Sequence, residues 1–450
     1  MFHEESIGLA ERILQLAQAR GADDVAVHVV SNRARQVRFS NSSVDVVKTW
    51  IETLVEVQIA LDRRVAVVST TSPPEERSLE GFIERAFERL KRVPARDIYA
   101  PLPEGPFDYP VIQGTYDPRL EEAQEELVDA AKEGIDSALA EGARRVAGVV
   151  RSYAGHECLL TSGGAEVCER FSRVNMEVRA LVDDEATGHG VTCSRSLDGL
   201  DPKRAGSEAG RDAVLASRVV DLPAGRYNAA FWWSAMTTLL GVFGSLASGL
   251  RALMQMTPYV DKLGQKVGTE LVTIADDPLI DGGYASRSFD LEGLPTRRNV
   301  IIEGGVLKTL LHNRLTAAHF RVRSTANAGW VFPNPWFLTM SPGDRTEEEI
   351  LEDLGRGVVV RNATYLRFQN YRTGDFSAVI RDGVFLVEGG EIKGEVRGLR
   401  LSENVLHLLS NVYAVSRETR QMTHWWAEFG PPVVTPVIAV RDVAFTAATA

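Results

Sequence analysis

The stretch TIADDPLIDGGYASRSFDLEG occupies residues 273–293, within a half of the chain that is otherwise rich in short β-runs. It combines a Gly-Gly pair with five acidic residues: Asp276, Asp277, Asp281, Asp290 and Glu292. An EF-hand calcium loop needs oxygen ligands at alternate positions around a central glycine, and the order here does not match it. Acid–Pro and Gly–Gly sequences mainly form turns, so we favour a structural turn. A pair of catalytic carboxylates stays open, because the sequence does not show their separation in space.

Composition places the chain among globular proteins and excludes some partners. Its 450 residues are more than one ordinary core accommodates, so two domains are expected. Hydrophobic residues make up 44% and charged residues 25% of the chain. The net charge of -11 argues against nucleic-acid binding, which needs a positive surface. No apolar run approaches the ~20 residues of a membrane span, so we expect no membrane association.

The cysteines and the N-terminus indicate the compartment. Cys158, Cys168 and Cys193 are the three cysteines, and they form no CxxC pair. This usage is typical of a reducing compartment and argues against a disulfide framework. The first 20 residues carry early acids and helical periodicity rather than a basic start and an apolar block, so they do not resemble a signal peptide. We therefore expect a cytoplasmic protein.

The hydrophobic pattern predicts an α+β chain of two domains, 1–220 and 221–450. In the N-terminal α+β domain, strand-like runs separated by polar joints predict antiparallel hairpins. Residues 101–118 are rich in proline and glycine and predict an extended connection. Helical periodicity predicts helices over 6–20, 76–92, 121–140 and 201–218.

The C-terminal domain is expected to be rich in β-structure around one buried helix. The segment YNAAFWWSAMTTLLGVFGSLASGLRALM, residues 227–254, is apolar on nearly every face and contains many small residues. Such a helix is expected inside a core, with strands packed closely against it. Thr346 followed by three glutamates predicts a short helix over 346–355, because acids favour a helix N-terminus.

Metal-ligand patterns in the chain are weak. HECLL, which starts at His156, has Leu160 where an H-E-x-x-H site needs its second histidine, and it lies in a strand-like run. We interpret it as an ordinary strand. A soft-metal cluster of His156, His189 and the three cysteines is a minor alternative, because no spacing matches a structural zinc site.

Aromatic residues cluster twice. Trp330 and Trp336 lie in WVFPNPWF, and Trp425 and Trp426 lie in THWWAEF. The commoner interpretation is packing in a core or an interface, and the alternative is a groove for an apolar peptide. No G-x-S-x-G elbow, P-loop or G-x-G-x-x-G sequence is present, so nucleophilic or nucleotide chemistry has little support.

Several long motifs, in order, resemble the TldD/PmbA family. They are the block from Val272 to Phe320, STANAGW, SPGDRTEEEIL and the block from Tyr371 to Ser416. The resemblance is strong over residues ~225–440 and weaker in the N-terminal domain, where it rests on the order of elements. It implies a two-domain architecture in which the acidic stretch is shared by all members.

The resemblance also implies which type of subunit this is. The family pairs a zinc-bearing subunit, which has H-E-x-x-x-H on a helix ahead of the acidic stretch and a cysteine near the C-terminus, with a metal-free subunit. Here Leu240 and Ser245 stand where the histidines belong, Gly241 replaces the glutamate, and His424 falls near the cysteine position. The chain therefore resembles the metal-free PmbA/TldE type, and we expect no metal in it.

Three functions follow as hypotheses. The first is the non-metal subunit of a heterodimeric peptidase, with zinc in a TldD-like partner and a peptide or unfolded protein as substrate. The second is a metal-independent enzyme of specialised biosynthesis, for which His424, Asp290, Glu292 and Asp375 are the candidate catalytic residues. The third is a homodimeric binding or regulatory protein, in line with the family's description as modulators of DNA gyrase.

Overall fold

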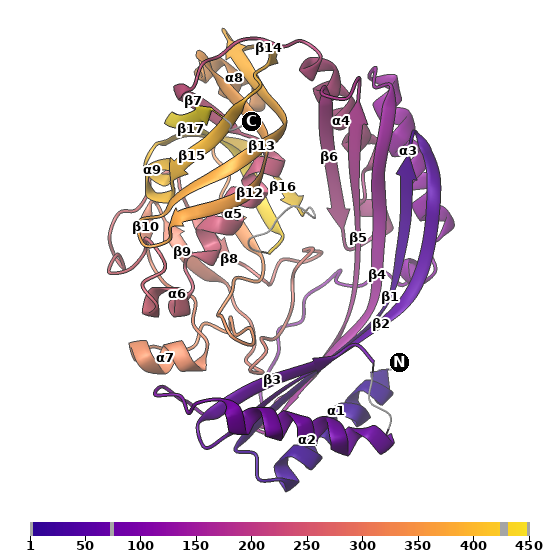
Figure 1. Ribbon diagram of the computed structural model, residues 1–450, viewed down its shortest axis with the longest axis vertical. Coiled ribbons are helices and arrows are strands. Elements are labelled where there is room, and N and C mark those ends of the chain that lie inside the picture. The colour runs from indigo at the N-terminus through magenta and orange to yellow at the C-terminus, as the bar shows by residue number, and fades with distance from the viewer. Residues whose placement is uncertain (1–2, 73–75, 424–430, 448–450) are drawn as a thin grey trace.

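The computed structural model describes residues 3–72, 76–423 and 431–447. Figure 1 shows two lobes, each built on one β-sheet, with the long strands of the first sheet running the height of the molecule. The chain passes from the first sheet to the second between the helix that ends at Ala216 and the strand that begins at Gly225. The α+β class is confirmed.

The first lobe is a six-stranded antiparallel sheet in the order β3-β2-β1-β4-β5-β6. Type I′-like turns join its first strands, since Asn41 and Ser42 have φ of 47° and 61°, and Asp62 and Arg63 have φ of 50° and 60°. These turns match the twist of long hairpins. The strands are β1 (Asp24–Ser40), β2 (Ser43–Leu61), β3 (Arg64–Thr70), β4 (Arg145–Thr161), β5 (Glu166–Leu181) and β6 (Thr187–Ser194).

Two pairs of helices cover one face of this sheet at opposite ends of its strands (Figure 1). At one end, α1 (His3–Ala19) packs on β1 and β4 while α2 (Glu76–Arg92) packs on β2 and β3; at the other end, α3 (Glu125–Ala140) packs on β1 and β4 while α4 (Pro202–Ala216) packs on β5 and β6. Both pairs contact odd-numbered residues of β1, such as Val27 and Val37. Alternate residues of a strand share a face, so the opposite face is left for the second lobe.

The second lobe is an eleven-stranded mixed sheet wrapped around helix α5 (Trp233–Ser245). Every residue of α5 from Trp233 to Gly244 is buried, as its uniformly apolar sequence predicts. The strands are β7 (Gly225–Phe231), β8 (Ile274–Asp276), β9 (Asn299–Glu303), β10 (Val306–Leu307), β11 (Leu338–Met340), β12 (Arg356–Asn370), β13 (Asp375–Glu388), β14 (Glu391–Glu395), β15 (Leu399–Asn404), β16 (Val412–Met422) and β17 (Val433–Ala447).

Short helices complete the two lobes. Capping boxes begin two of them: Asn313 caps α7 and Thr346 caps α8. The predicted helix over 346–355 is confirmed as α8, and that over 121–140 is a short 3₁₀ turn, η1, followed by α3. Their bounds are η1 (Pro118–Glu121), η2 (Leu197–Gly199), α6 (Gly249–Leu253), α7 (Arg314–Phe320), α8 (Glu347–Asp353) and α9 (Val405–Ser410).

One prediction about the cysteines is wrong. Cys158 on β4 and Cys168 on β5 form a disulfide, whereas the sequence argued against such bonds. The two residues are directly opposite each other in the antiparallel pair, with Cα atoms 4.1 Å apart. Strand register, which cysteine spacing does not reveal, therefore brings them together. Among the described helices, none combines the length and apolarity needed to cross a membrane.

Candidate functional site

Helix α5 carries the positions where the resemblance places metal ligands. Leu240 and Gly241 are buried inside the core of the second lobe, and Ser245 is partly exposed at the end of the helix. Leucine and glycine offer no side-chain donor, and one hydroxyl does not hold zinc. In the described part of the chain, no three His, Cys, Asp or Glu residues are arranged to hold a metal ion. These residues do not fit a zinc site.

The first acid of the opening stretch organises the aromatic segment. Asp276 ends β8 and is fully buried. Its Oδ1 accepts hydrogen bonds from the backbone N–H groups of Trp336 (2.7 Å) and Phe337 (2.8 Å), and its Oδ2 accepts one from Asn327 Nδ2 (2.6 Å). Burial raises the pKa of Asp276 to about 7. Its carboxylate therefore fixes the backbone of the neighbouring loop at Trp336 and Phe337.

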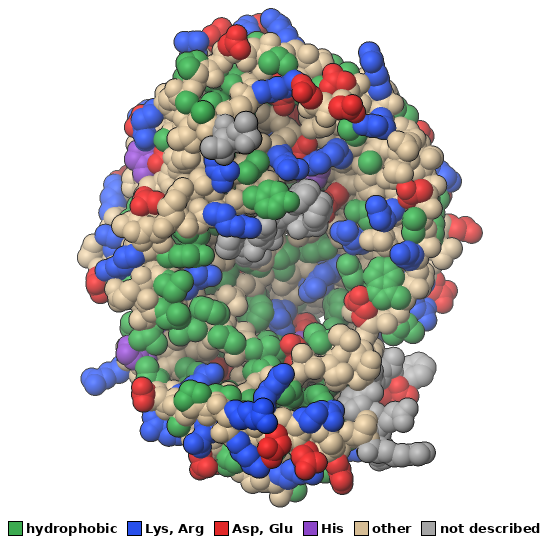
Figure 2. Space-filling model, viewed as in Figure 1, with side chains coloured by type: hydrophobic (Ala, Val, Ile, Leu, Met, Phe, Trp, Pro, Cys, Tyr) green, Lys and Arg blue, Asp and Glu red, His purple; other side chains and the backbone are tan. Residues whose placement is uncertain are grey.

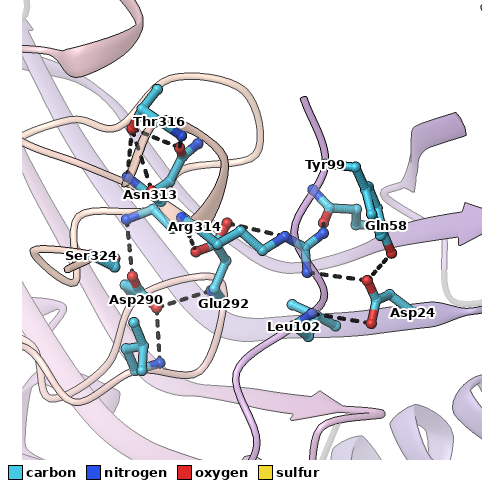
Figure 3. A network of polar contacts seen from close by, with 12 residues as sticks. Asp24, Gln58, Tyr99, Leu102, Asp290, Glu292, Asn313, Arg314, Thr316 and Ser324 are labelled. Atoms are coloured by element: carbon cyan, nitrogen blue, oxygen red, sulfur yellow. Dashed lines mark hydrogen bonds and ion pairs between the residues drawn. The ribbon is translucent and has the colours of Figure 1, made fainter. Parts of the chain in front are cut away.

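Asp290 has a similar role further along the stretch. Its Oδ1 accepts from the backbone N–H groups of Glu292 (3.0 Å) and Leu294 (2.9 Å), and its Oδ2 accepts from Ala328 N–H (3.0 Å). Burial raises the pKa of Asp290 to about 6. Three backbone donors thus occupy the carboxylate, and the stretch is a turn held from inside (Figure 3).

Glu292 belongs to a network that joins the two lobes. Its Oε2 accepts from the backbone N–H of Arg314 (2.9 Å), and its Oε1 lies 3.6 Å from Arg314 Nε. Figure 3 shows Arg314 reaching from α7 to the first sheet, where it donates to Gln58 Oε1 (2.9 Å) and lies 3.6 Å from Asp24. Tyr99 also donates to Asp24. Burial raises the pKa of Glu292 to about 8, and the nearby Asp290 adds to the shift.

The middle of the stretch rests on the free face of the first sheet. Arg195, at the end of β6, donates to the carbonyl oxygens of Gly283 (2.8 Å) and Ser286 (2.5 Å). Ser288 donates to Glu169 through both its hydroxyl (2.5 Å) and its N–H (3.0 Å), and Arg287 lies 3.4 Å from Glu157. The opening stretch therefore connects the two lobes, which supports the structural interpretation of its acids.

HECLL lies in β4, as predicted, and its two polar residues face opposite ways. His156 Nε2 is 2.8 Å from Ser6 Oγ on α1, whereas Glu157 contacts His28 Nε2 (3.2 Å) on the side of the second lobe. The imagined soft-metal cluster is wrong. Cys193 is opposite Asn175 on β5, seven residues from Cys168, which corresponds to ~23 Å along a strand.

Of the remaining predicted residues, Trp330 and Trp336 make packing contacts, Asp375 lies at a turn, and three residues lie outside the described ranges. Trp336 donates through Nε1 to Ala326 O (2.9 Å) and lies under the guanidinium of Arg287 at 4.2 Å. Trp330 lies near the His28 ring, with centroids 6.3 Å apart, and its carbonyl oxygen accepts from Gln58 Nε2, so Trp330 contributes to the contact between the lobes. Asp375 accepts from Asn404 Nδ2 (2.7 Å) at a turn, away from the other candidates. His424, Trp425 and Trp426 lie outside the described residues.

A cleft that the sequence did not reveal lies between the lobes. Its cavity measures about 300 Å³, and Figure 2 shows the surface hollowed between the two lobes. Ion pairs cross it from α4 to the second lobe: Asp212 lies 3.2 Å from Arg361, and Glu208 lies 2.5 Å from Arg420. The lining also includes His189, Trp232, Trp233, Ser234 and Glu347.

Two arginines of the cleft stack on two consecutive tryptophans at the start of α5. The Arg361 guanidinium lies 4.5 Å from the Trp232 ring, and that of Arg420 lies 4.3 Å from the Trp233 ring. Trp233 Nε1 is buried and has no hydrogen-bond partner among the residues that the structure describes. Burial raises the pKa of Asp212 to about 6. The cleft thus combines a titratable carboxylate, two cations and an available donor, which suits a polar ligand.

Comparisons with known proteins agree with this architecture. Residues 117–216 match the PmbA/TldA metallopeptidase central domain, and residues 224–447 match the PmbA/TldA metallopeptidase C-terminal domain. Metalloprotease MJ0996 of Methanocaldococcus jannaschii is 35% identical over 194 residues, which are 40% of this chain and 42% of that protein. The match thus spans less than half of that relative's length.

Two solved structures share the whole fold. A proposed modulator of a DNA gyrase from Thermotoga maritima has a TM-score of 0.83 at 25% identity, covering 98% of this chain and 100% of that one. TldE from Thermococcus kodakarensis has a TM-score of 0.85 at 23% identity, covering 97% and 100%. With two family domains matched in order over most of its length, the chain belongs to the TldD/PmbA family of metallopeptidase-like proteins.

Proposed function

We propose that this chain is the metal-free, TldE-type subunit of a heterodimeric peptidase, and that a TldD-like partner carries H-E-x-x-x-H and the zinc. The observation that carries the proposal is helix α5, where Leu240, Gly241 and Ser245 occupy the ligand positions implied by the family resemblance. A zinc site needs several nitrogen, sulfur or carboxylate donors together. The likeness to the TldE structure supports the fold alone.

In this role the chain completes a chamber and helps to hold a peptide or an unfolded protein in the cytoplasm. The interdomain cleft supports a binding role, because its arginines, carboxylates and Trp233 Nε1 provide both donors and acceptors for a peptide backbone. Hydrolysis itself then takes place in the partner.

The first test is the metal content of the purified full chain. We expect less than about 0.1 zinc per chain after dialysis against zinc-containing buffer, and no cleavage of an unfolded casein substrate. Stoichiometric zinc with peptidase activity in the chain alone would contradict the proposal. Mutating Ser245→Ala is a control, because a hydroxyl without other donors should not alter the zinc content.

The second test is co-expression with a TldD-like chain that has H-E-x-x-x-H intact. We expect a complex with equal numbers of the two chains that cleaves casein, and loss of cleavage when the glutamate of that motif is replaced by glutamine. If the two chains elute separately and the H-E-x-x-x-H chain has the same activity alone, the subunit role is wrong.

A metal-independent enzyme is the second candidate, and the cleft is the observation that favours it. Asp212, with its raised pKa of about 6, is buried beside Arg361 in the lining of the cleft, as suits proton transfer. Of the candidates predicted from sequence, Asp290 and Glu292 are occupied by backbone donors. Turnover of a small molecule by the zinc-free chain, lost in Asp212→Asn but kept in Asp375→Asn, would establish this function instead.

A further inference from the structure

Along more than half of its length, the outer edge of β2 has no neighbouring strand among the described residues. Strand β3 pairs with β2 only from Val55 to Leu61, while β1 pairs along the other side of β2 from Ser43 to Ala60. Between Ser43 and Leu54, no other strand in the described part of the chain pairs with the outer edge. Figure 1 shows this part of β2 at the margin of the first sheet.

This edge exposes apolar side chains. Val47 is 42% and Ile51 is 63% exposed, and both lie on the face of the sheet that the helices cover elsewhere. They occupy the uncovered part between the pair α1 and α2 and the pair α3 and α4. A long exposed edge with β-branched residues is a template for another strand, which natural proteins usually block or cover.

We propose that residues 45–53 of β2 pair in antiparallel fashion with the same residues of a second copy of this chain, about a two-fold axis at Thr49. In an antiparallel pair, directly opposed residues point to the same face. This register places Val47 opposite Ile51 of the second copy, and Ile51 opposite its Val47, so that both exposed apolar side chains gain a β-branched partner. The two sheets then form one continuous sheet of 12 strands, six from each copy.

The charges on the other face agree with this register. Lys48 comes directly opposite Trp50 of the second copy, where its ammonium can lie on the indole, and its diagonal neighbours there are Glu52 and Lys48. Moving the axis by one residue to Lys48 would place two lysines against each other. Moving it to Trp50 would place Val47 opposite Thr53 and separate it from Ile51. The strand is thus self-complementary about Thr49, which favours a second copy over an unrelated peptide.

This contact is independent of the proposed function, because it uses neither α5 nor the cleft. The first test is a cysteine scan from Val47 to Ile51 in the full chain. Background is low, since Cys158 and Cys168 are bonded to each other and Cys193 is buried. Under mild oxidation we expect about tenfold more covalent dimer for Thr49→Cys than for Lys48→Cys, because only residue 49 is opposite itself.

The second test uses charge pairs and sedimentation of the purified chain. Val47→Lys and Ile51→Glu should each weaken self-association about tenfold, since a charge then faces an apolar side chain. Mixing the two variants should restore a dimer, because the introduced lysine of one chain then faces the introduced glutamate of the other while the second pair stays native. Both positions are exposed, so unchanged melting temperatures should confirm intact folding.

Three results would overturn the inference: a monomeric wild type at all concentrations up to about 100 μM, equal crosslinking at residues 48 and 49, or no dimer in the mixture of variants. Failure of zinc or partner experiments would leave these results unaffected, so the two proposals are separable.

Discussion

Two of the regions in which the lobes meet differ in chemistry. Around Asp290 and Glu292, buried carboxylates accept from backbone N–H groups of one segment of chain. In the cleft, carboxylates of α4 face arginine side chains from β12 and β16, and solvent reaches the space between them. The carboxylates of the first region have hydrogen-bond donors from their own lobe, and those of the second region are paired with arginines of the opposite lobe.

A dense run of acids is therefore a poor guide to the position of a reactive or ligand-binding carboxylate. A carboxylate that accepts hydrogen bonds from several backbone N–H groups stabilises a turn. It does not readily bind a ligand, because breaking those bonds leaves buried donors unsatisfied. A carboxylate paired with an arginine at a solvent-accessible cleft can exchange its partner for a ligand. The acidic stretch therefore stabilises the architecture, whereas the cleft holds the charged groups that are accessible to a ligand.

The largest expected effect is from Asp290→Ala. It removes the acceptor for three buried N–H groups, so the free energy of unfolding should fall by about 3 kcal/mol or more. Urea unfolding measures this, with Asp375→Ala as the control. Asp375 lies at a partly exposed turn and should lower it by only about 0.5–1 kcal/mol. If both variants lower the free energy of unfolding equally, the backbone hydrogen bonds of Asp290 have no special role in stability.

A smaller loss is expected from Asp212→Ala in the cleft. Arg361 loses its carboxylate partner, and we expect the free energy of unfolding to fall by about 1–3 kcal/mol. Adding Arg361→Leu should recover part of the loss, because no unpaired charge then remains. A double-mutant cycle by urea unfolding measures the coupling, and strictly additive losses would show that the pair is not coupled.

The pH dependence of stability should separate Glu292 from ordinary carboxylates. Its pKa of about 8 in the folded chain exceeds the 4.5 of the unfolded chain, so the folded state binds more protons between these values. Its contribution is fully present below about pH 4.5 and is lost as pH rises through 8. When the pH is raised from 6 to 8.5, the free energy of unfolding should fall by about 1–2 kcal/mol less in Glu292→Gln than in the wild type. Parallel curves for the two proteins would contradict this.

The smallest effect is expected from Trp233→Phe. Most of the aromatic ring over Arg420 is kept, but the smaller phenyl ring leaves a small cavity, and the indole N–H without a described partner is removed. The free energy of unfolding should fall by about 1 kcal/mol or less, while affinity for a peptide held in the cleft should fall several-fold. A large loss of stability with unchanged peptide affinity, measured by calorimetry, would show that Trp233 only supports the core.

Local sequence predicted the elements well where periodicity was strong. Helix α2 matches the predicted 76–92, and α1 begins three residues before the predicted start at 6. The apolar segment at 227–254 predicted the burial of α5 because no face of it is polar. Turn chemistry likewise indicated that the run from Asp276 to Glu292 is structural.

Pairings between distant elements escaped prediction. The disulfide of Cys158 and Cys168 depends on strand register, and the bridge from Glu292 to Asp24 depends on Arg314, whose sequence neighbourhood carries no special signal. The cleft takes its charges from α4, α8, β12 and β16, which span more than 200 residues of sequence. Nothing in the spacing of these charges distinguishes them from ordinary surface residues.

The sequence by itself determined the class of fold, the family motifs and the lack of ligands at Leu240, Gly241 and Ser245, because these depend on residue identity and local periodicity. The tertiary structure was needed to show which carboxylates are hydrogen-bonded to backbone N–H groups and which face the cleft. It was also needed to show which strand edge has no neighbouring strand. Occupancy and pairing depend on what the rest of the chain brings within hydrogen-bonding distance, and that information is spread over both lobes.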